Sequence, residues 1–439
     1  MNNDKRILII VFCVGLFLQM FLLCRGWIAG DQVNLLNTGL DFAVDGKLNP
    51  VAKGMSGGGH IPGCMLQLLI GIPLKIFPYY KAPNIIIALF HIAAVLILIG
   101  VFRQSMGTRF TVALVAIYWL SPWRLFQSGI LWEPSYLYLP AAIQLWACWQ
   151  LQTIPKWLPS MILGFIIIFT LQIHASFLIL LILTAILIMR KLVKIKWLYF
   201  ASGFILGGIT MIPTIIALVN GTLPSIAPSE GFIGYGLVMV YPALKSILYW
   251  FRLGSLDSGQ QITQTIFFLK EWSNASLNHE IISIIVKMLR IIAAISILPC
   301  AIATWIYFKP IIKKENNRED QNKVWIRKYA FYAFIAMFAS SCLTPVATQG
   351  WHVSIIIFAA CIPIAHWVDE NWNIKAALIK WTIIAFIVLR IPLAFVIGYG
   401  HSWYRTAPLE KSIAKELISE RLLKILPSSS VEEYMNGVK

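Results

Sequence analysis

The chain has 439 residues, of which 59% are hydrophobic and 13% are charged. Soluble globular domains have about 45–50% apolar and about 25% charged residues, so the composition excludes a soluble protein and predicts one whose solvent is lipid. The formal net charge is +17, but Lys and Arg lie in short clusters between apolar runs, which argues against a nucleic-acid-binding face. The seven cysteines include no CxxC pair, and we assign them no redox role.

Apolar runs of about 17 to 25 residues, the length that crosses a bilayer core of about 30 Å, recur along the sequence. We therefore predict an all-α polytopic membrane protein with about eleven transmembrane helices. The first run lacks a small-x-small cleavage site and is predicted to be a retained span. The predicted spans are 7–24, 84–102, 110–122, 136–151, 158–173, 175–189, 197–219, 281–308, 329–343, 353–368 and 376–397.

The positive-inside rule orients these spans with the N-terminus inside, because the basic loops then fall on the inner side. The outer side receives residues 25–83, 123–135 and 220–280. We predict one transmembrane domain over residues 1–400 that includes these outer loops, followed by an outer-face tail over 401–439. Such a protein is expected in the inner (plasma) membrane, with its functional site on the periplasmic or extracellular side.

The first outer loop is predicted to contain two helices at the membrane surface. The first is amphipathic and starts near Asp31, with an apolar face formed by Leu35, Leu36, Leu40, Phe42 and Val44. The second covers residues 62–78 and carries three prolines, so we predict an interfacial helix. A carboxylate at Asp31 lies where a lipid headgroup would present its sugar and can accept a proton from an attacking hydroxyl, although Asp31 is equally suited to cap its helix.

A span followed by an acid, an amphipathic helix and a proline-marked helix resembles the GT-C glycosyltransferases, especially bacterial proteins of the protein O-mannosyltransferase and lipid A aminoarabinose transferase group. The catalytic acid of that family, usually followed by Glu, matches Asp31 in GDQ. Gln32 departs from this pattern, so a metal held by this pair is not expected. HIPG at 60–63 is similar to the element before the juxtamembrane helix, which implies a binding role for His60; a plain loop histidine is the alternative.

Two further matches lie in the next 110 residues or so. SGILWEPSYLYLP resembles the family's second outer loop and implies that Glu133 is a second catalytic acid; the alternative is an interfacial residue in an aromatic belt. TLQIHASFL is similar to the family's Gln-x-His element and implies that Gln172 and His174 line the cavity. The alternative for this polar pair is hydrogen bonding between helices.

A polyprenyl-phosphate donor requires cations at the outer boundary, since its phosphate gains charge as the sugar leaves. Candidates for donor binding are Lys53, Arg124 and Arg252, of which Arg252 is preferred because it follows Tyr249, Trp250 and Phe251. His352 opens the tenth span and is a further candidate. Each of these side chains has the alternative of a simple interfacial position. Arg390 interrupts the last span and must find a polar partner there.

The sequence predicts a glycosyltransferase that moves a sugar from a polyprenyl-phosphate-linked donor to a glycan, lipid or protein acceptor, with inversion and with Asp31 as base. Its partners are membrane lipid, donor and acceptor; nucleic acid, cofactor and metal are not expected. Nucleotide-binding loops of the type GxxxxGK(S/T) are absent. A flippase for polyprenyl-linked glycans is an alternative, although related halves are not seen, and an O-antigen polymerase or ligase acting through 220–280 is another.

Overall fold

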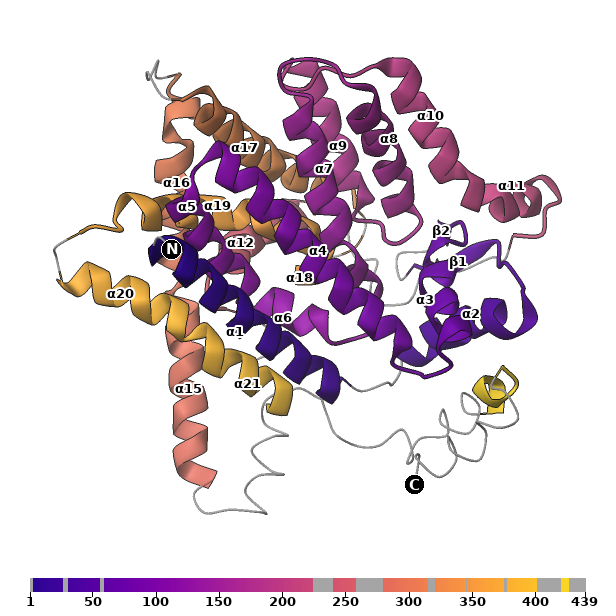
Figure 1. Cartoon of the computed structure of the whole chain (residues 1–439), viewed down its shortest axis with the longest axis horizontal. Helices are drawn as coiled ribbons and strands as arrows, with labels where there is room; N and C mark the ends of the chain where they lie inside the picture. Colours follow the sequence, from indigo (N-terminus) through magenta and orange to yellow (C-terminus); the bar gives the residue numbers. More distant parts are fainter. Residues whose placement is uncertain are drawn as a thin grey trace.

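The computed structural model describes residues 3–26, 31–55, 59–223, 240–257, 279–314, 320–344, 346, 348–374, 377–400 and 420–425. Apart from one two-stranded antiparallel sheet, the regular structure of these residues is helical (Figure 1). Six of these helical segments are long and apolar enough to cross a membrane, which confirms a polytopic all-α membrane protein. They are α1 (Asn3–Arg25), α4 (Ala82–Ser105), Trp197–Val219, Lys287–Ile312, Gly350–Glu370 and Ala377–Tyr399.

Each of the eleven predicted spans coincides with helical structure, but eleven membrane crossings are not established. Several of these helices are shorter than a bilayer requires. They are α5 (Thr108–Trp119), α7 (Tyr138–Gln150), α8 (Trp157–Leu171) and α9 (Phe177–Met189). The predicted spans from residue 197 onwards coincide with α10 (Trp197–Gly208), η2 (Ile209–Met211), α11 (Ile212–Val219), α15 (His279–Ile295), α16 (Ile297–Ile312), α17 (Gln321–Cys342), α18 (Gly350–Val353), η3 (Ser354–Ile356), α19 (Ile357–Glu370), α20 (Ala377–Val388) and α21 (Arg390–Gly400).

Helices α5 and α19 form the centre of the helix bundle. Every residue of α5 from Phe110 to Trp119 is buried, and α19 is buried from Ile357 to Ala365. A helix that is apolar all round has no polar face to offer water, so it becomes enclosed by its neighbours. Around this pair lie α1, α4, α12 (Val240–Gly254), α16 and α17, and α8, α9 and α10 extend the bundle on one side (Figure 1).

Close backbone approach joins α8 to α10. A Cβ atom added at Gly203 would lie 1.9 Å from the carbonyl oxygen of Met161, and one at Gly164 would lie 2.1 Å from that of Phe200. Small residues at such positions let two membrane helices pack backbone to backbone. The helical segment Trp197–Val219 is thereby fixed against α8, and its far end supports residues 63 and 64.

The segment predicted to be the first outer loop folds into a small lobe, here called the first-loop lobe (residues 31–55 and 59–76), beside the lower end of α4 (Figure 1). It contains α2 (Asp31–Asp45), β1 (Val51–Gly54), β2 (His60–Pro62) and α3 (Met65–Ile76). Both predicted helices are present, and α2 buries Leu35, Leu36 and Leu40 as its amphipathic pattern requires. The β1–β2 hairpin between them was not predicted.

The predicted outer loop 123–135 is not an exposed loop. Residues 121–138 are all buried and form α6 (Pro122–Ser128) and η1 (Glu133–Tyr136), which pack against α1, α4 and α21. The segment is rich in aromatic and aliphatic side chains, and its helical turns pair most of its backbone polar groups internally, so burial is favourable. The segment is thus buried helical structure, and its place on the outer side of the membrane stays a prediction.

Arg390 finds its polar partners at the ends of two helices. It begins α21 after the break with α20, and its side chain is completely buried. Its Nη1 donates to the carbonyl of Ile117 at 3.0 Å, and its Nη2 donates to that of Gly254 at 2.9 Å. Carbonyls in the last turn of a helix lack intrahelical donors, so the guanidinium satisfies them while joining α21 to α5 and α12.

Candidate functional site

Lys53 joins the two acids that the sequence proposed as catalytic. Its Nζ lies 2.6 Å from Glu133 Oε1 and 3.6 Å from Asp31 Oδ2. The Glu133 side chain is 4% exposed and the Asp31 side chain is 51% exposed. The ammonium group therefore offsets the cost of burying the Glu133 carboxylate. It also faces the half-exposed carboxylate of Asp31. We call these three residues the ion cluster.

Three elements position the ion cluster. Asp31 is the first residue of α2, where the helix dipole favours a negative charge. Lys53 lies on β1 and is paired with Ile61 of β2. Glu133 opens η1, directly after the extended backbone of Trp132. The cluster thus combines an exposed helix end, a strand and a buried turn that are far apart in sequence.

The hairpin that carries Lys53 is held by the end of the span Trp197–Val219. The backbone N–H of Gly63 donates to Thr214 Oγ1 at 2.7 Å, and that of Cys64 donates to the carbonyl of Thr210 at 2.9 Å. Thr214 also donates to the carbonyl of Pro50, just before β1. Gly63 has φ of +82°, and a Cβ there would lie 2.1 Å from Gln172 Oε1, so a glycine is required.

Gln172 takes part in this support. It is completely buried, its Nε2 donates to the carbonyl of Gly207 at 2.8 Å, and its Oε1 accepts from Thr210 Oγ1 at 2.7 Å. Both ends of the amide are thus used to join the end of α8 to α10 and η2. These contacts favour helix-to-helix bonding for Gln172 over the predicted binding role.

His174 and His352 lie together next to the ion cluster. Their rings stack with centroids 5.9 Å apart, and Ser176 Oγ lies 2.7 Å from His174 Nδ1 while donating to the carbonyl of His352 at 2.6 Å. Burial, followed by the neighbouring His352 and the charge of Lys53, lowers the pKa of His174 to about 3. His174 is therefore neutral at physiological pH and can hydrogen-bond a ligand without adding charge.

A second group of cations lies on α12. Arg252 pairs with Asp257, and its guanidinium lies 4.8 Å from the ring centroid of Tyr249. Lys245 lies 5.9 Å from the same ring, and burial together with Arg252 lowers the pKa of Lys245. The charge of Lys245 acts in turn on His352. The two histidines therefore lie within reach of the charges of both Lys53 and Lys245.

The two remaining candidates lie in different surroundings. Arg124 is completely buried, donates to Gln19 Oε1 at 2.5 Å and stacks 3.8 Å from the ring centroid of Trp119, so its charge is used inside the helix bundle. His60 is partly exposed and lies opposite Gly54 in the hairpin, next to Lys53 in the ladder. Within the described ranges, no group of three or more His, Cys, Asp or Glu side chains is arranged to hold a metal ion.

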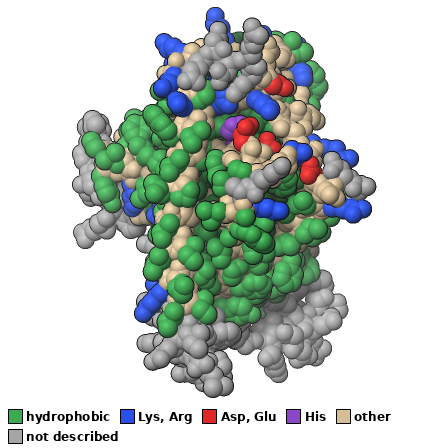
Figure 2. Space-filling view, turned by 90° about the vertical axis from the view of Figure 1, so that its left-hand side faces the viewer, with side chains coloured by type: hydrophobic (Ala, Val, Ile, Leu, Met, Phe, Trp, Pro, Cys, Tyr) green, Lys and Arg blue, Asp and Glu red, His purple; other side chains and the backbone are tan. Residues whose placement is uncertain are grey.

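Sequence reasoning missed Ser176 and Asp257, which orient His174 and Arg252. The spacing offered a signal for each, since Ser176 follows His174 by two residues and Asp257 follows Arg252 by five. Figure 2 shows the side of the molecule that lies at the left of Figure 1, where hydrophobic side chains form a broad apolar face. An exposed apolar surface of this size is typical of contact with a membrane.

Two solved structures have the same overall fold. A structure of ArnT from Cupriavidus metallidurans bound to undecaprenyl phosphate aligns over 95% of this chain and 77% of that one, with 12% identity and a TM-score of 0.51. The apo state of the same protein aligns over 97% and 78%, with 10% identity and a TM-score of 0.50. No family model and no curated protein matches the sequence. The predicted resemblance to the GT-C fold is therefore confirmed.

Proposed function

We propose that this protein is a membrane glycosyltransferase that uses a polyprenyl-phosphate-linked sugar as donor and a hydroxyl of a glycan, lipid or protein as acceptor. The fold it shares with an undecaprenyl-phosphate-bound protein supports this donor class. The observation that carries the proposal is the position of Lys53, whose ammonium group lies next to both the buried Glu133 and the exposed Asp31. Such a cluster beside apolar helices provides a base and a phosphate-binding cation together.

In the proposed reaction, Asp31 accepts the proton of the acceptor hydroxyl as its oxygen attacks the anomeric carbon. The bond from this carbon to the phosphate oxygen breaks on the opposite face, so the configuration inverts and polyprenyl phosphate leaves. Asp31 suits the role of base because its carboxylate is half exposed, whereas Glu133 is enclosed and serves to hold Lys53. Glu133 is thus proposed as a positioning acid, a narrower role than the catalytic one predicted for it.

Lys53 is proposed to stabilise the leaving phosphate. An ammonium group has three N–H donors, and two of them face Glu133 and Asp31, which leaves one for a phosphate oxygen. Lys245 and Arg252 extend the positive charge along α12, and the neutral His174 can bond a sugar or phosphate oxygen. Cations that act where charge develops lower the barrier most in a site that excludes water.

Purified protein in detergent distinguishes a transferase from a flippase. The donors are undecaprenyl phosphate carrying labelled glucose, mannose or aminoarabinose, and a bacterial membrane extract supplies acceptors. We expect one donor to lose its sugar and release undecaprenyl phosphate, which requires no sealed compartment. No release from any donor, with lipid-linked sugar moved across proteoliposomes instead, would favour the flippase.

Binding of undecaprenyl phosphate alone gives a second readout that does not depend on the sugar. Native mass spectrometry is expected to show one bound lipid, and Lys53→Met is expected to weaken it about 10-fold, as the loss of a charge-assisted contact implies. The matched control is Lys75→Met, an exposed lysine of α3 in the same lobe. Equal weakening by both substitutions would show that binding depends only on overall charge.

A further inference from the structure

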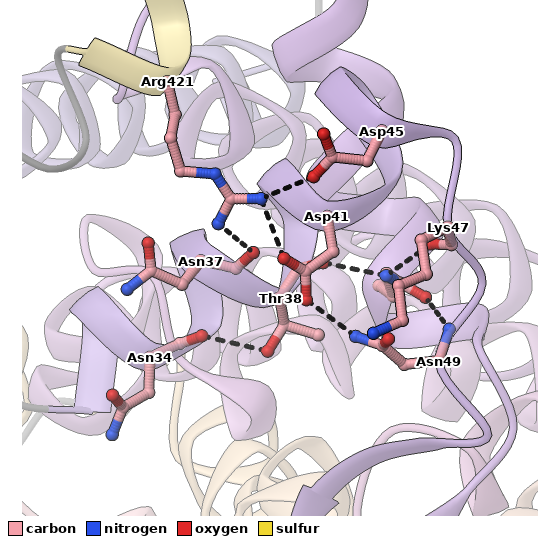
Figure 3. A network of polar contacts seen from close by, with 9 residues as sticks. Asn34, Asn37, Thr38, Asp41, Asp45, Lys47, Asn49 and Arg421 are labelled. Atoms are coloured by element: carbon pink, nitrogen blue, oxygen red, sulfur yellow. Dashed lines mark hydrogen bonds and ion pairs between the residues drawn. The ribbon is translucent and has the colours of Figure 1, made fainter.

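A short segment near the C-terminus, residues 420–425, is fastened to α2; we call it the C-terminal clip. Arg421 Nη2 lies 2.8 Å from Asp41 Oδ1 and 3.2 Å from Asp45 Oδ2, and Nη1 donates to the carbonyl of Asn37 at 3.4 Å (Figure 3). The next side chain, Leu422, is completely buried in the main hydrophobic core. The clip is therefore held to α2 and to the core by both charge and apolar packing.

Asp41 is shared between the clip and the turn that leads to β1. Its Oδ1 faces Arg421, while its Oδ2 accepts from Asn49 Nδ2 at 2.9 Å and its carbonyl accepts from the N–H of Lys47 at 3.0 Å (Figure 3). One carboxylate thus connects three separate segments of chain. A part-buried carboxylate with partners at both oxygens has little freedom to rotate.

Gln67 of α3 holds the same turn from below. Its Nε2 donates to the carbonyls of Thr38 and Lys47 at 2.9 and 3.0 Å, and its Oε1 accepts from the N–H of Asn49 at 2.9 Å. Gln67 is completely buried. The turn from Lys47 to Asn49 is therefore fixed on one face by α3 and on the other by Asp41 and its partner Arg421.

Both elements joined by this network carry members of the ion cluster. Asp31 begins α2, the helix on which Asp41 and Asp45 lie, and Lys53 follows Asn49 by four residues on β1. The 3.6 Å contact between Lys53 and Asp31 depends on how α2 and β1 lie relative to each other. Within the described part of the clip, Arg421 forms the ion pairs with α2.

We propose that Arg421 is a positioning residue for the transfer reaction. By holding Asp41 and Asp45, it keeps α2 and the turn before β1 in the arrangement that places Asp31 beside Lys53. This inference rests on the proposed function, because the ion cluster matters for rate only if Asp31 is the base. A base displaced by about 1 Å loses up to about 100-fold in rate.

The test compares Arg421→Ala, Arg421→Lys and the control Lys424→Ala, an exposed cation of the same clip. We expect Arg421→Ala to lower kcat about 10-fold with little change in donor KM, and to speed amide hydrogen exchange in α2 and residues 46–53. Arg421→Lys keeps one charged contact and is expected to recover part of kcat. Lys424→Ala is expected to match the wild type in both measurements.

Wild-type kcat together with unchanged α2 exchange in Arg421→Ala would overturn the proposal, as would a loss of kcat that Lys424→Ala reproduces. If Arg421→Ala does not fold, Asp45→Asn removes only the longer contact and is expected to lower kcat about 2-fold with a matching rise in α2 exchange. Hydrogen exchange is read without substrate. A wild-type protein with no transferase activity would therefore refute the proposed function while leaving the fastening of α2 by Arg421 testable.

Discussion

The first-loop lobe and the central pair α5 and α19 are built by different forces. In the central pair almost every side chain is apolar and buried, and the helices are held by packing. In the first-loop lobe, one face of α2 is buried while the rest of its order comes from polar contacts through Asp41, Gln67 and Lys53. Altering a packing contact changes the stability of the protein. A polar side chain that is partly exposed can also take part in a reaction.

This difference explains where the site lies. A buried helix pair offers rigid support but no group that can meet a substrate, and a lobe held by directional bonds can place a half-exposed carboxylate to within an ångström. The bundle contributes Glu133 as a fixed anchor, and the lobe contributes Lys53 and Asp31. Substitutions in the two regions should therefore differ in which property they change.

Lys53→Met is expected to have the largest effect, since it removes the group that joins Asp31 of the lobe to the buried Glu133. It leaves Glu133 buried without its ammonium partner, which costs about 3 kcal/mol of stability, the lower end of the range for broken buried ion pairs because Lys53 is partly exposed. Transfer should fall about 100-fold. Melting temperature in detergent and the rate of undecaprenyl phosphate release measure the two effects.

The double variant Lys53→Met with Glu133→Gln sharpens this prediction. Removing the unpaired charge should recover most of the lost melting temperature but none of the lost activity. A double variant as unstable as Lys53→Met would show that Lys53 stabilises the protein through its aliphatic chain and not through Glu133.

Gly203→Ala tests the close packing of α8 against α10. Its new Cβ would lie 1.9 Å from the carbonyl oxygen of Met161, so α8 and α10 must separate, at a cost of about 1–3 kcal/mol. Gly208→Ala is the matched control on α10, because its Cβ would meet no atom within 4 Å. Equal melting temperatures for the two variants would contradict the close packing of α8 and α10.

The pH dependence of stability is expected to show the smallest effect. The pKa of His174 is about 3 in the folded protein and near 6.5 in the unfolded chain, so the unfolded chain binds the extra proton first. The stability due to neutral His174 is complete above pH 6.5 and decreases as the pH falls towards 3, by about 1 kcal/mol between pH 7 and pH 5 after allowance for its partial exposure. In His174→Gln the melting temperature should depend less on pH over this interval. An unchanged dependence would contradict the lowered pKa of His174.

Local patterns predicted much of the fold. Apolar run length located the helices, and the amphipathic spacing after Asp31 located α2, because both depend on residues close in sequence. The burial of Glu133 was not predictable in this way, since a segment with an acid and several aromatics reads equally well as an interfacial loop. Only the packing of η1 against α4, α6 and α7 distinguishes the two.

The site was predicted as a set of residues and not as an arrangement. Asp31, Glu133, Lys53, His174, His352 and Arg252 were all named from the sequence, but the bridging position of Lys53 depends on the β1–β2 hairpin and on its support by Thr210 and Thr214. The contacts of Arg421 also depend on the fold, because its partners on α2 precede it by 376 and 380 residues. Contacts of this kind leave no periodic trace in the sequence.

The most direct test of the account is the rate of undecaprenyl phosphate release by Asp31→Asn in detergent, compared with the wild type and with Glu370→Gln, an exposed acid at the end of α19. An amide keeps the size of the side chain but cannot take up the acceptor proton. The account predicts a loss of about 100-fold or more for Asp31→Asn, with lipid binding and melting temperature retained and Glu370→Gln unchanged. Release at the wild-type rate by a folded Asp31→Asn protein would contradict it.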